Sequence, residues 1–154
     1  MDLNKRKSPR IPDYNYAEVN YYFITLCTDQ KKCLFHYRGQ MNRFGEIAEA
    51  CIKEIPSHYP GIRVDKYVVM PNHVHLILVV EAKNTAGAVT VIGTYKSSVS
   101  RKIHKLMPDL KIWQRSFHDH IIRNQKSYEM IWNYIDTNPM RWHADCFYSE
   151  EMTV

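Results

Sequence analysis

The chain has 154 residues, 45% of them hydrophobic, which suits one domain with a sizeable core and is too short for two ordinary domains. Its 21 Lys and Arg residues exceed its 16 Asp and Glu residues, and this excess favours a polyanionic partner such as nucleic acid. Without a bilayer-spanning apolar run, a secretory leader or CxxC cysteine spacing, we expect a reduced, cytoplasmic protein with no membrane partner.

The first elements along the chain are predicted as a basic arm, a strand and a helix. Residues 1–18 are rich in Lys, Arg and Pro and are expected to form an extended arm. Residues 20–28 are aromatic and β-branched and are apolar on both faces, which is typical of a central strand. Apolar residues spaced three and four apart predict a helix over residues 40–58, ended by Pro56 and the Pro60-Gly61 pair.

A hairpin and a basic helix are predicted next. Residues 62–70 and 72–80 indicate two strands with a tight link. Residues 82–90 are small and polar, as in a loop. Residues 91–107 then predict a basic helix that ends before Pro108.

The last two elements complete a recognisable plan. Residues 112–123 predict a fourth strand, and residues 127–138 predict an aromatic-rich helix with Ser127 as its N-cap. The order β-α-β-β-α-β-α predicts an α+β, ferredoxin-like (RRM-like) fold with an antiparallel sheet, helices packed on one face and an added C-terminal helix. Because this plan serves many functions, it does not identify one.

The segment YVVMPNHVHLILVV, residues 67–80, places two histidines in an otherwise apolar strand. Side chains alternate along a strand, so His73 and His75 share one face and Val74 takes the other. Neutral imidazoles are common ligands of divalent metals, whereas a buried polar ring without a partner is costly. The pair therefore favours a metal or catalytic site, and two core histidines bonded to backbone carbonyls are the alternative.

Tyr134 and Asn138 lie four residues apart in the last predicted helix and so share a helix face. Asn138 offers an amide oxygen suited to Mg²⁺ or Mn²⁺, and Tyr134 offers a phenol that can act as a nucleophile. Two imidazoles and an amide oxygen can hold an ion and leave positions for phosphate oxygens. The alternatives are a core aromatic at Tyr134 and a helix-ending residue at Asn138.

At these residues the chain resembles the single-tyrosine transposases of the HUH nuclease superfamily, which are named for a His-hydrophobic-His motif. It is most similar to the bacterial REP-associated tyrosine transposases. The matching segments cover most of residues 5–142 in the family's order, and they are YFITLCT, YVVMPNHVHLIL, IGTYKSSVSR, WQRSFHDHIIR and YIDTNP.

The resemblance implies that His73, His75 and Asn138 bind a divalent metal ion, Mg²⁺ or Mn²⁺, and that Tyr134 is the nucleophile. It also implies a single-stranded or hairpin DNA substrate, cleaved and rejoined through a 5′-phosphotyrosine during DNA transposition. A bacterial, nucleoid-associated location follows from the same resemblance. Whether the chain acts as a monomer or a homodimer is left open.

Basic residues on the second helix and the fourth strand are the expected phosphate contacts. These candidate DNA-binding residues are Lys96, Arg101, Lys102, Arg115 and Arg123. A solvated charged face is the alternative for each of them.

A second same-face histidine pair, His118 and His120, flanks Asp119 and so departs from the His-hydrophobic-His pattern. We expect it to support the site, to contact DNA or to be structural. Tyr95 and Tyr128 are the competing tyrosines, expected in packing or DNA contacts.

We expect a basic arm over residues 1–18, a transposase-like domain over residues 19–142 and a tail over residues 143–154. The competing function is a non-catalytic or domesticated nucleic-acid-binding module of similar fold that recognises DNA hairpins. An RNA-recognition module would carry stacking aromatics on the strand where this chain carries histidines. A structural zinc protein is disfavoured because only two strong ligands lie close together in sequence.

Overall fold

The computed structural model describes residues 19–81, 86–145 and 147–148. The predicted basic arm and part of the predicted loop over residues 82–90 lie outside these residues. The main sheet has the strand order β4-β5-β1-β6, and all its neighbouring strands are antiparallel. Its strands are β1 (Val19–Cys27), β4 (Ile62–Met70), β5 (His73–Glu81) and β6 (His118–Ile122).

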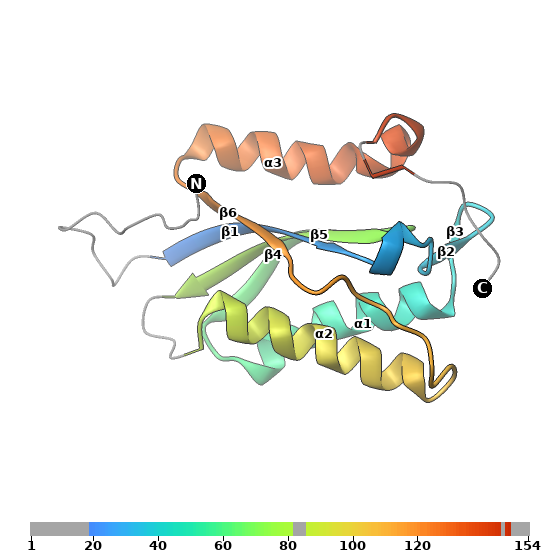
Figure 1. Ribbon diagram of the computed structural model, residues 1–154. Helices are drawn as coiled ribbons and strands as arrows, with labels where there is room; N and C mark the ends of the chain where they lie inside the picture. Colours follow the sequence, from blue (N-terminus) through green and yellow to red (C-terminus); the bar gives the residue numbers. More distant parts are fainter. Residues whose placement is uncertain (1–18, 82–85, 146, 149–154) are drawn as a thin grey trace.

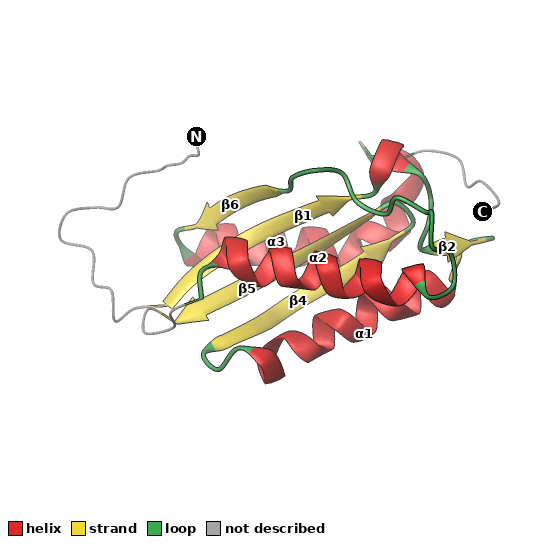
Figure 2. Ribbon diagram, turned by 60° about the horizontal axis from the view of Figure 1, so that its bottom comes forward, coloured by secondary structure: helices red, strands yellow, loops and turns green. Residues whose placement is uncertain are grey.

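In the described part of the chain, helices cover the sheet from both sides (Figure 1). They are α1 (Arg43–His58), α2 (Ala88–His104) and α3 (Gln125–Thr137). Helices α1 and α2 lie together on one face, whereas α3 lies on the other; Figure 2 views the molecule from the α1 and α2 side. The predicted α+β fold, with two helices on one face and an added C-terminal helix, is confirmed.

Four short elements were not predicted from the sequence. They are the 3₁₀ segments η1 (Asp29–Lys31) and η2 (Asn138–Ala144) and the paired strands β2 (His36–Tyr37) and β3 (Gln40–Met41). Two-residue strands are too short to show a period-two pattern. The segment η2 matters most, because it continues α3 toward the C-terminus and carries residues to the start of β5.

The first two helices differ from their predicted bounds. Helix α1 begins at Arg43 because residues 40–41 pair in β3, and the Asn42 side chain accepts from the Gly45 N–H as its N-cap. Pro56 lies inside α1 and does not end it, since the Tyr59 N–H still donates to the Ile55 carbonyl. Helix α2 begins at Ala88, three residues earlier than predicted, because the small residues there do not oppose a helix.

The last strand and helix are also corrected. Strand β6 covers only His118–Ile122, and Trp113 contributes an isolated bridge to Thr28. Between Trp113 and β6, the Gln114 N–H still donates to the Cys27 carbonyl of β1, and the carbonyls of Gln114 and Ser116 accept from the Lys96 ammonium. Helix α3 is capped by Asn124, whose side chain accepts from the Ser127 N–H, so Ser127 is not the N-cap.

Strand β5 is buried on both faces, as its apolar sequence predicts. One face packs into the large apolar core beneath α1 and α2 through Val74, Leu76, Leu78 and Val80. The other face lies under α3 and carries Ile77 and Val79, preceded in the same alternation by His73 and His75. None of the helices in the described part of the chain has the length and apolar character that a membrane span requires.

Candidate active site

The site is built where β5 begins, at the C-terminal end of β1. His73 lies opposite Cys27 and His75 lies opposite Thr25 in the antiparallel register. The two imidazole rings lie on the same face of the sheet, with centroids 4.6 Å apart. Both side chains are buried, at 0% and 2% exposure. The alternation predicted from the sequence is therefore present.

Asn72 sets the proton position on His73. The Nδ2 group of Asn72 donates to the carbonyls of Lys31 and Phe147, so its Oδ1 faces the His73 ring. The His73 Nδ1–H donates to that oxygen at 2.8 Å. The lone pair of His73 is therefore on Nε2, the nitrogen that faces the interior of the site.

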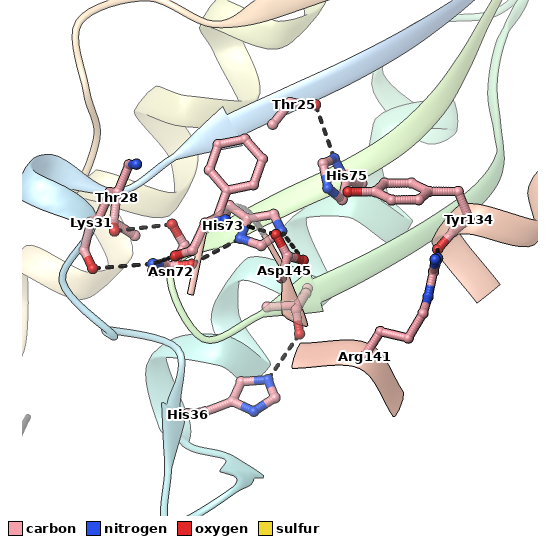
Figure 3. Close-up of polar contacts among 12 residues, drawn as sticks. Thr25, Thr28, Lys31, His36, Asn72, His73, His75, Tyr134, Arg141 and Asp145 are labelled. Carbon is pink, nitrogen blue, oxygen red and sulfur yellow. Dashed lines mark hydrogen bonds and ion pairs between the residues drawn. The ribbon is translucent and has the colours of Figure 1, made fainter. Parts of the chain in front are cut away.

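Thr25 is the corresponding hydrogen-bond partner of His75. Its hydroxyl oxygen lies 2.9 Å from Nδ1 of His75 across the β1–β5 pair (Figure 3). A hydroxyl can accept a hydrogen bond, and when Nδ1–H donates to it the lone pair of His75 is on Nε2 as well. Each histidine thus has one nitrogen fixed by a neighbour and one nitrogen left for another group.

Helix α3 and the start of η2 bring the other two predicted residues to this place. The Tyr134 ring lies 5.4 Å from the His75 ring and 6.2 Å from Phe23, measured between centroids. Its side chain extends toward His75 in Figure 3. Asn138 caps the C-terminus of α3 and is 2% exposed. Their four-residue spacing puts both on the helix face that covers the histidines.

Burial keeps both imidazoles neutral near pH 7. Burial lowers the pKa of His75 to about 3, and the neighbouring His73 lowers it further. Burial also lowers the pKa of His73, although the Asp145 carboxylate and the Asn138 amide act in the opposite direction. A neutral imidazole with a free nitrogen is the form that binds a metal ion.

The unpaired polar atoms of the described residues gather in this site. The buried side-chain nitrogens and oxygens without a hydrogen-bond partner are Nε2 of His73, Nε2 of His75, Oδ1 of Asn138 and Oδ2 of Asp145. Buried polar atoms are almost always paired, so such a cluster marks these atoms as candidate ligands for a cation. Within the described residues, no three or more His, Cys, Asp or Glu side chains are arranged to hold a metal ion. The predicted ligand set depends instead on the Asn138 amide oxygen.

Residues of η2 and of the segment after it lie against His73, which the sequence did not indicate. The Phe147 ring lies 4.6 Å from the His73 ring, and the Trp142 ring lies 6.2 Å from it. Oδ2 of Asp145 lies 3.8 Å from Nε2 of His73. Asp145 and Phe147 fall in the predicted C-terminal tail, where no motif or periodicity marks them.

Arg141 is a further residue that sequence reasoning missed. Its guanidinium lies 5.1 Å from the centroid of the Tyr134 ring and donates to the Tyr134 carbonyl at 3.3 Å. Its side chain is exposed, so it can contact a ligand as well as Tyr134. The sequence shows that Arg141 lies three residues after Asn138. It does not show that the side chain points toward Tyr134.

The predicted DNA-binding residues are not all brought to this face. Lys96, Arg101 and Lys102 lie on α2, across the sheet from the histidines. The Lys96 ammonium binds two backbone carbonyls, and Lys102 pairs with Glu54 of α1. Arg115 and Arg123 are exposed before and after β6. Their proposed contacts with DNA stay predictions.

The second histidine pair lies at the sheet edge. His118 and His120 are exposed and lie opposite Thr25 and Phe23, so they share the α3 face with His75 at the far side of β1. The competing tyrosines are in packing positions: Tyr95 donates to the Ala48 carbonyl in the core, and Tyr128 donates to Asp65.

Comparison with known proteins identifies a matching family model and a related sequence. The family model described as "Transposase IS200 like" matches residues 16–138. An uncharacterized protein of Haemophilus influenzae is 32% identical over 170 residues, and the match covers 95% of this chain and 94% of the relative.

Two solved structures share the fold. One is the REP-associated tyrosine transposase bound to a REP hairpin, with a TM-score of 0.60 at 20% identity; the match covers 88% of this chain and 74% of that one. The other is a proposed transposase from Deinococcus radiodurans, with a TM-score of 0.57 at 17% identity, and here the match covers 86% of this chain and 97% of that one.

Proposed function

This chain belongs to the family of IS200-like transposases and is a transposase, and from this premise we propose a specific chemistry for it. It cleaves and rejoins single-stranded DNA through a covalent 5′-phosphotyrosine at Tyr134. His73, His75 and Asn138 hold the divalent ion, Mg²⁺ or Mn²⁺, that the reaction uses.

One observation carries the proposal. Three buried, unpartnered donor atoms, on His73, His75 and Asn138, lie in the same site as the Tyr134 ring. Two imidazole nitrogens and an amide oxygen form a mixed donor set that suits Mn²⁺ or Mg²⁺. Three protein donors are fewer than an octahedral ion takes, so positions remain for substrate oxygens.

Different residues of the chain have different roles in the proposed reaction. A bound divalent ion would neutralise the negative charge of a phosphodiester and make its phosphorus easier to attack. Asn72 and Thr25 orient the histidines through their Nδ1 atoms. The Arg141 guanidinium lies against the Tyr134 ring and donates to the Tyr134 carbonyl, so it helps to hold the tyrosine in position.

In the proposed step, one bond to phosphorus forms as another breaks. The Tyr134 oxygen forms a bond to phosphorus, and the bond from phosphorus to the 3′ oxygen breaks. The phenol gives up its proton, and the departing 3′ oxygen gains one. An ordinary tyrosine has a pKa near 10, so the phenol needs a proton acceptor or a nearby positive charge as it attacks.

A tyrosine suits a reaction in which strands are joined again. The phosphotyrosine bond keeps the energy of the broken phosphodiester, so the 3′-hydroxyl of another strand can reverse the step. A water molecule as the nucleophile would release that energy and end in simple hydrolysis. The phenol beside the predicted ligands therefore supports a strand transferase over a nuclease.

The proposed substrate is single-stranded DNA next to a hairpin. The structurally similar REP-associated tyrosine transposase is bound to a REP hairpin, and the net positive charge of this chain suits a polyanion. We expect the affinity for a hairpin with a single-stranded flank to fall at least about tenfold between about 50 and about 200 mM salt. Fluorescence anisotropy measures it, and equal, salt-insensitive binding of blunt duplex would contradict the substrate assignment.

The direct test is a search for the covalent adduct. The full chain is incubated with a labelled hairpin oligonucleotide, with Mn²⁺ or with EDTA, and the products are separated under denaturing conditions. The proposal expects a labelled protein band that requires the metal. DNA binding without any adduct, across a panel of hairpin sequences, would favour the alternative, a non-catalytic hairpin-binding module.

A further inference from the structure

Asp145 places a carboxylate inside the site that the proposed ligand set does not use. Its side chain is 0% exposed, and its Oδ2 lies 3.8 Å from Nε2 of His73 (Figure 3). Its Oδ1 accepts a hydrogen bond from the Phe147 N–H at 2.8 Å. Its Oδ2 has no hydrogen-bond partner, so half of this buried carboxylate is unsatisfied.

The unsatisfied oxygen belongs to a group of four such atoms. The other three are the atoms proposed to bind the metal, on His73, His75 and Asn138. A buried carboxylate oxygen without a partner is costlier than a buried amide or imidazole, because it carries formal charge. One cation would satisfy all four atoms together.

The contact between Asp145 and His73 is not a hydrogen bond. The Nδ1–H of His73 donates to Asn72, so the lone pair of Nε2 faces Oδ2 of Asp145. The distance of 3.8 Å is also too long for an N–H donor and a carboxylate oxygen. Two electron-rich atoms facing each other repel, unless a cation lies between them.

We infer that Asp145 is a further donor to the divalent metal, joining His73, His75 and Asn138; the inference rests on the proposed function. Two donors each about 2.1 Å from one ion lie roughly 3.0–3.4 Å apart. The distance of 3.8 Å is wider, and among the described residues His73, His75 and Asp145 are not already arranged to hold an ion, so the inference requires the carboxylate to turn toward the histidines when an ion binds.

The chain holds the carboxylate in place for this role. Asn72 Nδ2 donates to the Phe147 carbonyl at 2.7 Å, and Asn72 Oδ1 accepts from His73. The same amide therefore orients one ligand and anchors the segment that carries the other. The imidazoles and the amide are neutral, so Asp145 is the donor that reduces the charge of the ion and tightens its binding.

The test measures metal binding without DNA. MnCl₂ is titrated into the full chain by calorimetry, with the wild type, Asp145→Asn and Asp119→Asn. Asp119→Asn is the matched control, because it removes the same charge from an exposed residue opposite Ile24, on the other face of the sheet. We expect Asp145→Asn to raise the Kd for Mn²⁺ at least about tenfold and Asp119→Asn to leave it unchanged.

Thermal unfolding separates this role from a structural one. In EDTA, Asp145→Asn is expected to melt at the wild-type temperature or above it, because an unpaired buried charge is removed. In Mn²⁺, the melting temperature of the wild type is expected to rise more than that of the variant. A bound ligand stabilises a folded protein more when its concentration exceeds its Kd by a larger factor. A purely structural Asp145 would instead lower the melting temperature equally in both buffers.

The outcomes distinguish this inference from the function it rests on. If the wild type binds Mn²⁺ and His73→Ala does not, but Asp145→Asn binds as the wild type does, Asp145 is not a donor and the proposed function stands. If the wild type binds no Mn²⁺, both fail. A crystal of the full chain soaked in MnCl₂ gives an answer even if the variant does not fold, because an ion beyond bonding distance of Asp145 refutes the assignment.

Discussion

The two faces of the sheet differ in what they bury. Beneath α1 and α2, the core consists of apolar side chains such as Ile24, Leu76 and Val99. Beneath α3, the apolar cluster is small, and among the described residues the buried side-chain nitrogens and oxygens without partners all lie in the adjoining site. Because β5 supplies alternate residues to both faces, one strand contributes apolar core residues on one side and the proposed metal ligands on the other.

The largest effect is expected on the α3 face. Tyr134→Phe removes one oxygen and keeps the ring against His75 and Phe23, so the fold is retained and the covalent adduct is lost. Mass spectrometry of the trapped peptide identifies the linked residue. Tyr128→Phe is the control, since that tyrosine bonds Asp65 at another position along α3. A DNA-linked peptide with a tyrosine other than Tyr134 would overturn the assignment.

Removing a histidine tests whether chemistry and DNA affinity are separate. His73→Ala or His75→Ala removes one proposed metal ligand, and the loss of several kcal/mol of transition-state stabilisation corresponds to at least about 100-fold slower cleavage. DNA affinity is expected to stay near that of the wild type, because Lys and Arg contacts to phosphate are independent of the metal. Cleavage gels and anisotropy measure the two quantities, and unchanged cleavage in either variant would refute the ligand assignment.

The neighbouring residue on β5 should show the opposite pattern. Leu76 is 0% exposed on the α1 and α2 face, so Leu76→Ala leaves a cavity and is expected to lower the free energy of unfolding by about 2–5 kcal/mol. Metal affinity at low temperature, where the variant is folded, should be unchanged. Urea unfolding and calorimetry test this separation. A loss of metal binding in folded Leu76→Ala would show that the two faces are coupled.

The smallest expected effect is on stability at alkaline pH, and it concerns one tyrosine on each face of the sheet. Tyr67 donates to Glu49 under α1, and Tyr128 donates to Asp65 under α3. Burial raises the pKa of each to about 12, and the hydrogen bond to the carboxylate adds to the shift. An unfolded tyrosine titrates near pH 10, so the stabilisation is fully present below that pH and is lost as the pH rises through about 12.

The measurement is urea unfolding at about pH 9 and about pH 11. Tyr67→Phe and Tyr128→Phe should each reduce the loss of stability between these pH values, and the double variant should reduce it by the sum, because the two residues share no partner. A double variant with the wild-type loss would show that other groups control the alkaline transition.

Short-range periods in the sequence predicted which of the candidate residues share a face. The period of two along β5 predicted that His73 and His75 share a face, and the four-residue spacing predicted the same for Tyr134 and Asn138. Nothing in the sequence indicated Asp145, whose position beside His73 depends on how the segment after η2 folds back. No period links positions 73 and 145, so only packing brings them together.

The sequence by itself determined the order of the main elements and the central position of β1. It also determined which side chains share a face within each element, because backbone geometry repeats every two residues in a strand and every 3.6 residues in a helix. Only the tertiary structure decided which helix covers which face of the sheet. That choice placed Tyr134 over His75, turned the Lys96 ammonium toward backbone carbonyls, and joined Asn72 to both His73 and the C-terminal segment. Periodicity states which side chains point the same way, whereas the burial of apolar faces against one another decides what they meet.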